Sequence, residues 1–316
     1  MSIAEPAVER FPHPIVAYIA ATRPPFILAT VVPVILGLSY SVYQGHDLNM
    51  LNAILTLVAA VLLHAGINVL NDYYDALNGT DDNNDERIFP FTGGSRFIQN
   101  EVMTRQQTLL YGICLMLAVM LIGVHLIRQT GMPLFWLGML GMVIGWGYSA
   151  PPLRLNSRGI GELCVLAGFS LLPLGAWLVQ TNSFSVAVVM VALPVGLLTA
   201  NLLFINQFPD RKADIQAGKL HWVARLEPRV ARWGYVVIAG LAWMISLMLV
   251  VFGLLPVAAL IALLPAILTY KASRILIKHA DHPQQLTPAI QLTILAMLAH
   301  GVLLSVILAV HTHLVA

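Results

Sequence analysis

Nine apolar runs dominate the sequence, and short polar breaks separate them. They cover residues 24–43, 51–70, 107–127, 132–150, 160–181, 184–208, 230–252, 255–270 and 288–310. A helix that crosses a bilayer needs about 20 predominantly apolar residues, and most of these runs reach or approach that length. The pattern therefore predicts an all-α, polytopic transmembrane bundle of about nine helices.

The basic residues fall almost entirely on one side of this predicted bundle. Nine spans would place successive connections on alternate sides of the membrane. One side then holds all of the seventeen Lys and Arg residues except Arg128. This basic side comprises the N-terminal segment and the connections near 71–106, 151–159, 209–229 and 271–287. Cytoplasmic loops carry an excess of Lys and Arg. We therefore expect a cytoplasmic or inner-membrane protein of bacterial type, with a cytoplasmic N-terminus and the C-terminus on the opposite side.

Composition narrows the range of partners. The chain has 316 residues, of which 58% are hydrophobic and 10% charged, and its formal net charge is +2. Basic residues are too few and too scattered for a nucleic-acid surface, so we expect the lipid bilayer as a partner and no nucleic acid. Cys114 and Cys164 lie in apolar runs without metal-ligand spacing, which indicates packing roles.

The second and sixth apolar runs end in the same short pattern, an Asn followed four residues later by an Asp. Asn68 and Asp72 form the first copy, and Asn206 and Asp210 form the second, 138 residues later. The matched placement predicts a single domain, 1–316, built from two related halves at about 15–158 and 159–275, with a ninth helix added. Repeats of this kind often place a binding site at their interface.

Each copy of the pattern supplies a pair of carboxylates. If the helices continue, Asp72 and Asp75 share one face, and so do Asp210 and Asp214. Such charges are costly near a membrane, about 2.5 to 3.5 kcal/mol toward the helix centre, and clustered carboxylates repel unless a cation is present. Oxygen ligands favour Mg²⁺, which also binds phosphate oxygens. The pairs, with Asp81 as a further candidate ligand, predict a magnesium site for a diphosphate substrate.

Three basic residues lie close to these acids in the sequence. Arg23 begins the first apolar run, Arg87 follows the first acidic segment, and Lys219 follows Asp214 by five residues. Each could neutralise diphosphate oxygens that the metal leaves exposed.

A third polar stretch, YSAPPLRLNSRGIGE, connects the fourth and fifth runs on the same side. Its two prolines stop a helix and its glycines allow close backbone approach. We expect a central cavity that opens to the cytoplasmic face, with Tyr148, Arg154 and Arg158 at its mouth.

Three ordered segments resemble motifs of the UbiA superfamily of intramembrane prenyltransferases. NDYYDALNGTD is similar to its first Asp-rich motif, NQFPDRKADIQAGK to its second, and YSAPPLRL to the YxxPPL segment between them. The NDYxDxxxGxD spacing and the RGIGE stretch resemble the MenA-like branch, which prenylates 1,4-dihydroxy-2-naphthoate. The resemblance implies Mg²⁺-dependent transfer of a polyprenyl group from a polyprenyl diphosphate to an aromatic acceptor, in menaquinone or other quinone biosynthesis.

The resemblance also implies roles for the motif residues. The implied metal ligands are Asp72, Asp75, Asp210, Asp214, Asn68, Asn206 and Asp81. The implied catalytic residues are the four motif aspartates of the two pairs, Arg87 and Lys219. The implied substrate-binding residues are Arg23, Asn68, Asn71, Asn206, Tyr148, Arg154 and Arg158.

Departures from the MenA-like pattern leave the acceptor open. Phe208 and Pro209 precede Asp210, LHWVARLE follows Lys219, and FTGGSR occupies 91–96. Other aromatic acceptors, including 4-hydroxybenzoate and homogentisate, are alternatives. A cation-coupled transporter is an alternative from a different class, although transporter sites usually lie near the bilayer midplane and these acids lie at helix ends.

Overall fold

The computed structural model describes residues 4–315, with side chains described as far as His311. Its regular structure is helical, with no strand within that range, so the predicted all-α class is confirmed. The helices are α1 (Pro14–Ala21), α2 (Pro24–Tyr43), α3 (Met50–Asn78), α4 (Arg105–Thr130), α5 (Met132–Ser149), α6 (Gly161–Thr181), α7 (Val186–Gln216), α8 (Trp222–Arg225), α9 (Pro228–Val251), α10 (Ala266–His279) and α11 (Thr287–Val315). Short 3-10 helices cover Val8–Arg10, Leu155–Arg158, Val257–Leu263 and Pro283–Gln285.

Each predicted apolar run falls on helical structure. Within the described part of the chain, eight segments are long and apolar enough to cross a membrane. These are α2, α3, α4, α6, α7, α9, the segment Val257–His279 and α11. The run at 132–150 forms α5, an 18-residue helix outside those eight that packs against α4 and α6. The protein is an integral membrane protein with one spanning candidate fewer than the nine predicted runs.

Two helices continue beyond the apolar runs that predicted them. α3 is 29 residues long and α7 is 31 residues long, so both extend about two turns past positions 70 and 208. α3 ends at Asn78, and the next residue, Gly79, has a φ of 76°, in the left-handed region that glycine adopts at little cost. These extensions keep all four motif aspartates on helices.

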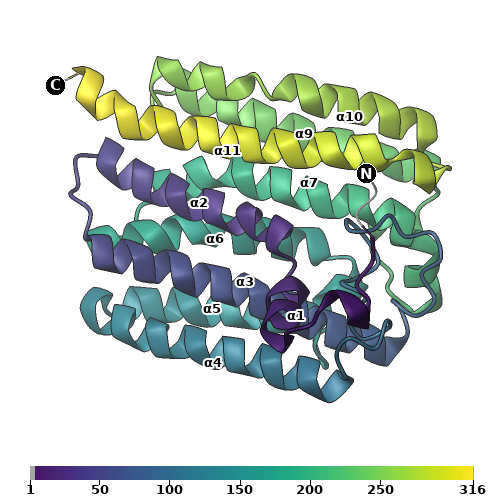
Figure 1. The fold of residues 1–316 in the computed structure, drawn as a ribbon. Coiled ribbons are helices and arrows are strands. Elements are labelled where there is room, and N and C mark those ends of the chain that lie inside the picture. Colours follow the sequence, from purple (N-terminus) through teal and green to yellow (C-terminus); the bar gives the residue numbers. More distant parts are fainter. Residues whose placement is uncertain (1–3, 316) are drawn as a thin grey trace.

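The long helices lie side by side along a common direction (Figure 1). α7 contacts α2, α6, α9 and α11, and α3 contacts α2, α4, α5 and α6. The C-terminal end of α11 lies at the end of the bundle opposite the α3–α4 connection (Figure 1). The relation between two halves of the bundle stays a prediction.

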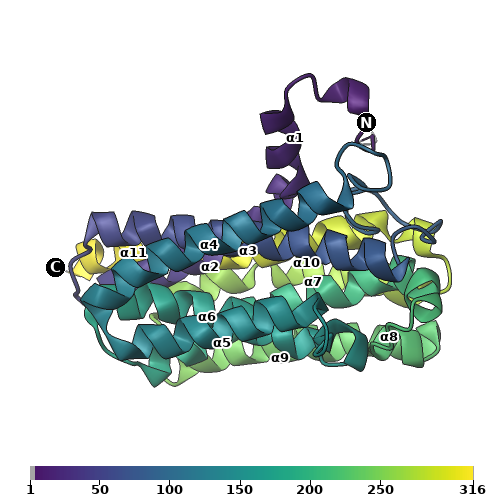
Figure 2. The ribbon, with the colours of Figure 1, turned by 90° about the horizontal axis from the view of Figure 1, so that it is seen from below.

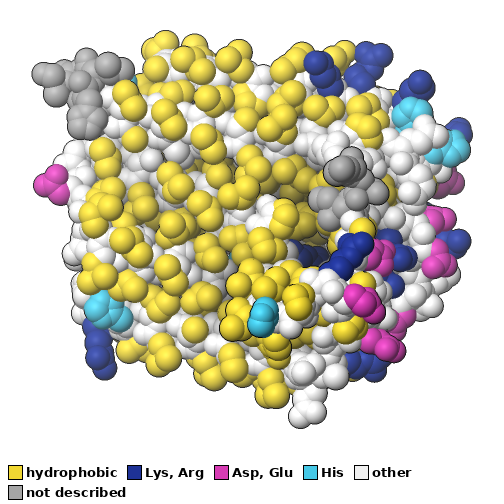
Figure 3. Space-filling model, in the orientation of Figure 1, with side chains coloured by type: hydrophobic (Ala, Val, Ile, Leu, Met, Phe, Trp, Pro, Cys, Tyr) yellow, Lys and Arg dark blue, Asp and Glu magenta, His cyan; other side chains and the backbone are white. Residues whose placement is uncertain are grey.

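Charged side chains gather at one end of the molecule. Figure 3 shows hydrophobic side chains over most of the visible face, with Lys, Arg, Asp and Glu concentrated where the α3–α4 connection lies. An apolar band with a polar end is the surface expected of a protein embedded in lipid.

The N-terminal segment covers the α3–α4 connection. α1 stands away from the side of the bundle (Figure 2) and packs Ala17 and Ala21 against Phe97 and Met103 of that connection. The carboxylate of Glu5 accepts a hydrogen bond of 2.7 Å from the Arg87 Nε and one of 3.3 Å from the Asn100 side chain. The segment therefore holds the α3–α4 connection through both apolar contacts and hydrogen bonds.

Small residues allow the helices to approach closely. A Cβ added to Gly37 of α2 would lie 2.7 Å from the Cα of Pro173 and 2.9 Å from the Cβ of Ala176 in α6, closer than carbon atoms normally pack. Glycine at such a crossing is typical of membrane helix interfaces.

Gly37→Ala is expected to destabilise the protein, because the backbone of α6 must move to admit the methyl group; overpacking typically costs about 1 to 3 kcal/mol. Thermal unfolding of the purified protein in detergent measures the effect. Gly123→Ala in α4 is the matched control, since nothing lies within 4 Å of its Cβ position. Equal melting temperatures for the two variants would show that the α2–α6 contact is not tight.

Candidate active site

A cavity of about 330 Å³ lies between α2, α3, α5, α6 and α7. Its lining on α3 recurs every three or four residues, which is one face of a helix. Ala60, Leu63 and Ile67 form the apolar part of that face, and Asn68, Asn71 and Asp75 form the polar part. At 1.5 Å per residue this face spans about 22 Å. The cavity therefore joins an apolar interior to a polar end.

The two aspartates of the first motif have different surroundings. Asp75 lines the cavity and Asp72 does not. Asp72 instead forms an ion pair with Arg23 and accepts a 3.2 Å hydrogen bond from the backbone N–H of Ser95. Its carboxylate is thus held by the start of α2 and by the α3–α4 connection.

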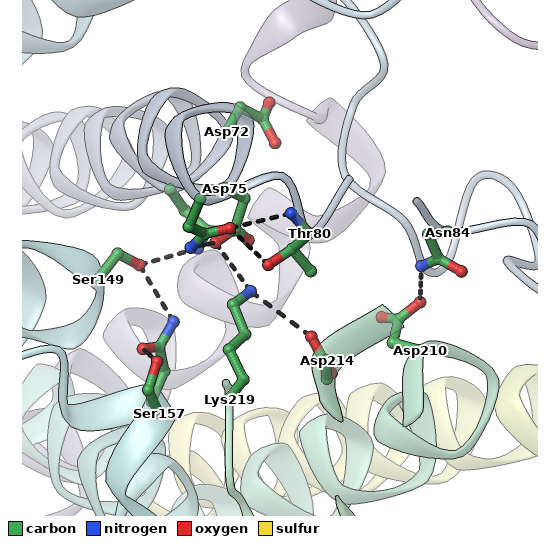
Figure 4. Close-up of polar contacts among 12 residues, drawn as sticks. Asp72, Asp75, Thr80, Asn84, Ser149, Ser157, Asp210, Asp214 and Lys219 are labelled. Carbon is green, nitrogen blue, oxygen red and sulfur yellow. Dashed lines mark hydrogen bonds and ion pairs between the residues drawn. The ribbon is translucent and has the colours of Figure 1, made fainter. Parts of the chain in front are cut away.

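Lys219 joins the two motifs. Its Nζ lies 2.8 Å from Asp75 Oδ1 on α3 and 3.7 Å from Asp214 Oδ1 on α7 (Figure 4). Burial alone would lower the pKa of Lys219, but the carboxylates of Asp75, Asp214 and Asp81 outweigh it and raise that pKa above its ordinary value. The side chain is therefore a buried ammonium ion at the centre of the carboxylates.

The chain reaches this position through a tight turn after α7. Gly218 has a φ of 74°, and the backbone N–H of Lys219 donates to the carbonyl of Asp214 at 2.8 Å. Two residues further, His221 Nε2 lies 2.9 Å from Asp214 Oδ2. Asp214 thus has one carboxylate oxygen toward Lys219 and the other toward His221.

The α3–α4 connection closes the polar end of the cavity. The Asn84 side chain donates a 2.6 Å hydrogen bond to Asp210 Oδ1 (Figure 4). Asp81 is buried, its backbone carbonyl accepts from the Arg96 guanidinium, and its carboxylate lies where a Cβ on Gly94 would be. Burial, and then the charges of Asp75 and Asp72, raise the pKa of Asp81 well above its ordinary value. The α3–α4 connection therefore places the Asp81 carboxylate close to other carboxylates, in surroundings that favour a cation.

Most predicted site residues meet at this cavity. Those that line it are Arg23, Asn68, Asn71, Asp75, Asp81, Tyr148, Asn206, Asp210, Asp214 and Lys219. Four others do not line it: Asp72, Arg87, Arg154 and Arg158.

Two of these outlying residues, Arg87 and Arg158, donate hydrogen bonds to other protein groups. Arg87 donates from Nη1 to the carbonyl of Asn84 at 2.5 Å and from Nε to Glu5. It therefore stabilises the α3–α4 connection without lining the cavity. The exposed Arg158 donates to the carbonyl of Pro152 at 2.8 Å. From the connection between α5 and α6, which carries Arg154 and Arg158, the residue that lines the cavity is Asn156.

Several cavity residues were missed from the sequence. Asn84 lies within the acidic stretch that drew attention to its carboxylates, His221 follows Lys219 by two positions, and Gln207 is next to Asn206. Their proximity to the motifs was a usable signal. Which neighbours of a motif face a cavity, however, depends on how the helices pack.

The oxygen atoms at the polar end of the cavity are of the kind that binds Mg²⁺. Asp81 Oδ2 and Asn206 Oδ1 are buried without a hydrogen-bond partner, and oxygen ligands of this kind suit a hard cation. Across the described residues no three His, Cys, Asp or Glu side chains are already arranged to hold a metal ion. Lys219 lies between Asp75 and Asp214 instead. Convergence of the motif aspartates on one ion stays a prediction.

Curated relatives resemble the chain over much of its length. The 1,4-dihydroxy-2-naphthoate octaprenyltransferase of Escherichia coli (strain K12) is 28% identical over 286 residues, which cover 88% of this chain and 90% of that protein. The 2-carboxy-1,4-naphthoquinone phytyltransferase of Synechocystis sp. is 28% identical over 66% of each chain.

Solved structures share the fold. A UbiA homologue from Archaeoglobus fulgidus bound to DMAPP and Mg²⁺ superposes with a TM-score of 0.65 at 17% identity and covers 92% of this chain and 99% of that one. A structure described for digeranylgeranylglyceryl phosphate synthase gives 0.66 at 13% identity, over 94% and 99% of the two chains.

The sequence model of one family matches nearly the whole bundle. It is described as the UbiA prenyltransferase family and matches residues 30–310, which include both Asp-rich motifs and the segment between them. The resemblance seen in those motifs is thereby confirmed, and the transporter alternative loses its support. The chain belongs to the UbiA prenyltransferase family.

Proposed function

We propose that this prenyltransferase transfers a polyprenyl group from a polyprenyl diphosphate to an aromatic acceptor in the membrane, in a reaction that requires Mg²⁺. We propose 1,4-dihydroxy-2-naphthoate, or a related aromatic acid of quinone biosynthesis, as the acceptor. The observation that carries the proposal is the continuity of one cavity from a buried cluster of charges to an apolar interior. A substrate with a diphosphate head and a hydrocarbon tail matches both parts.

The polar end offers groups for the head. Lys219 and Arg23 line the cavity as cations, and hydrogen bonds from such groups to phosphate are strong. Asp75, Asp81, Asp210 and the other cavity carboxylate, Asp214, are the proposed Mg²⁺ ligands. When bound, the ion would neutralise the diphosphate and so favour its departure.

The apolar end offers a dry environment for the tail and the reacting carbon. Phe26, Leu63, Phe169 and Leu202 line it. Exclusion of water limits hydrolysis of an allylic cation before an acceptor can attack. Tyr148 and Asn156 border the same space, and we propose that the ring of the acceptor lies beside them.

Names of the relatives support the choice of acceptor. Naphthoate and naphthoquinone derivatives appear in the names of the E. coli and Synechocystis proteins. Arg154 and Arg158 were predicted to bind substrate, but neither lines the cavity. For either of them to bind an acceptor carboxylate there, the loop that carries them would have to change conformation.

The proposed reaction predicts a specific pattern of products. Purified protein in lipid vesicles, supplied with labelled polyprenyl diphosphate, is expected to prenylate 1,4-dihydroxy-2-naphthoate in the presence of Mg²⁺ and not in EDTA. Parallel assays with 4-hydroxybenzoate and homogentisate distinguish the alternatives, and mass spectrometry of the product reports whether CO₂ is lost. The proposal fails if none of these acceptors takes up the label.

We also propose that the charged end faces the cytoplasm, as its excess of Lys and Arg suggests. In a background with Cys114→Ser and Cys164→Ser, Asp47→Cys between α2 and α3 should react with a membrane-impermeant thiol reagent in intact cells. Asp82→Cys, on the α3–α4 connection beyond the C-terminal end of α3, should react only after permeabilisation. Both positions are exposed. The reverse labelling pattern would show the opposite orientation.

A further inference from the structure

A buried pair of polar side chains lies beside the cavity, apart from the charged cluster. Glu162, in the first turn of α6, accepts a 2.8 Å hydrogen bond from the Gln207 Nε2 of α7. The two side chains are more than nine-tenths buried, with 8% and 7% of their surface exposed. Gln207 lines the cavity and Glu162 does not. The carboxylate is therefore placed to act through its partner.

The carboxylate fixes the direction of the amide. A carboxylate only accepts hydrogen bonds, so the NH₂ group of Gln207 must point toward Glu162 and its carbonyl oxygen away from it. That oxygen, Oε1, is buried and has no hydrogen-bond partner, and neither does Glu162 Oε2. Buried polar atoms without partners are uncommon in native proteins, which suggests that a ligand supplies the missing donor.

Of the two unpartnered atoms, only Gln207 Oε1 belongs to a residue that lines the cavity, and it is an acceptor, so a ligand there must offer a hydrogen-bond donor. An O–H donates a hydrogen bond, whereas a carboxylate, a diphosphate oxygen or an ether oxygen does not. Tyr148 provides an aromatic surface nearby, since a ring carbon of it lies 3.7 Å from the Cβ position of Gly161, the residue before Glu162. A hydroxyl on an aromatic ring has both features that this environment would recognise.

The position along α7 also suits an acceptor. Gln207 precedes Asp210 by three residues, which is about 4.5 Å along the helix axis toward the apolar interior. A ring held there would lie next to the end of the prenyl chain that carries the diphosphate, without competing for Lys219.

We propose that Gln207 determines specificity by accepting a hydrogen bond from a ring hydroxyl of the aromatic acceptor, and that Glu162 is the positioning residue that orients its amide. The inference rests on the proposed function and names the group of the acceptor that is recognised. Sites that hydrogen-bond a substrate hydroxyl reject analogues that lack it much more strongly than apolar pockets reject an extra carbon.

The test compares a hydroxylated acceptor with its O-methyl ethers. Wild-type protein is assayed with 1,4-dihydroxy-2-naphthoate and its two mono-O-methyl ethers, or with 4-hydroxybenzoate and its ether if that acid is the acceptor. One ether is expected to show a kcat/KM at least tenfold below that of the parent acid. In Gln207→Leu this ratio should fall to within threefold, with the KM for the polyprenyl diphosphate unchanged.

The positioning role has its own test. Glu162→Gln is nearly isosteric but lets the Gln207 amide take either orientation, so the KM for the acceptor should rise several-fold while the KM for the diphosphate stays the same. The double variant Glu162→Gln, Gln207→Glu restores one donor and one acceptor within the pair and again presents an oxygen to the cavity. It is expected to regain the wild-type discrimination between hydroxyl and ether. Gln216→Leu, an exposed site on α7, is the matched control.

The outcomes are separable. Prenylation by the wild type, with the hydroxyl-to-ether ratio unchanged in both single variants, would overturn the inference and leave the proposed function standing. Absence of prenylation of every aromatic acceptor by the wild type would overturn the proposed function itself. If Gln207→Leu fails to fold, the conservative Glu162→Gln variant and the double variant still decide the matter.

Discussion

Both the fold and the candidate site depend on basic side chains that neutralise a cluster of carboxylates at one end of an apolar bundle. Asp75 and Asp214 share Lys219, while Asp72 pairs with Arg23. A buried carboxylate without such partners would cost several kcal/mol. Because these pairs connect α2, α3 and the turn after α7, each helix end that brings a charge to the site is also held in place by it. The same cations that balance the carboxylates are available to an anionic substrate.

The rest of the molecule supports this end and continues it inward. The N-terminal segment fastens the α3–α4 connection, through Glu5 and through α1, so that Asn84 and Asp81 face the cavity. Toward the interior the lining becomes apolar, and Gln207, which is hydrogen-bonded to Glu162 outside the lining, lies at the transition. Charge, hydrogen bonding and apolar surface thus follow one another along a single cavity, in the order that a prenyl diphosphate and a phenolic acceptor would use them.

The sequence predicted the helices well, because an apolar run long enough to cross a bilayer is usually a membrane-spanning helix. It predicted the helix ends less well: α3 and α7 continue as polar helices beyond positions 70 and 208, where hydropathy gives no signal. Periodicity grouped Asp72 with Asp75, yet Asp72 is bound by Arg23 and Ser95 whereas Asp75 lines the cavity, a difference that depends on how α2 and the α3–α4 connection pack against α3. Contacts that cross between loops, such as Asn84 with Asp210, depend on packing over long sequence distances and had no local signature.

Equilibrium binding of a non-hydrolysable prenyl thiodiphosphate to the purified protein, with Mg²⁺ or with EDTA, tests most directly whether the buried cluster holds a diphosphate through a cation. Binding is expected to be about tenfold or more tighter with Mg²⁺, a difference of about 1.4 kcal/mol or more. Asp75→Asn should lose most of that gain, whereas Asp82→Asn, an exposed site on the α3–α4 connection, should keep it. Equal affinity with and without Mg²⁺, or full metal dependence in Asp75→Asn, would contradict this assignment of the site.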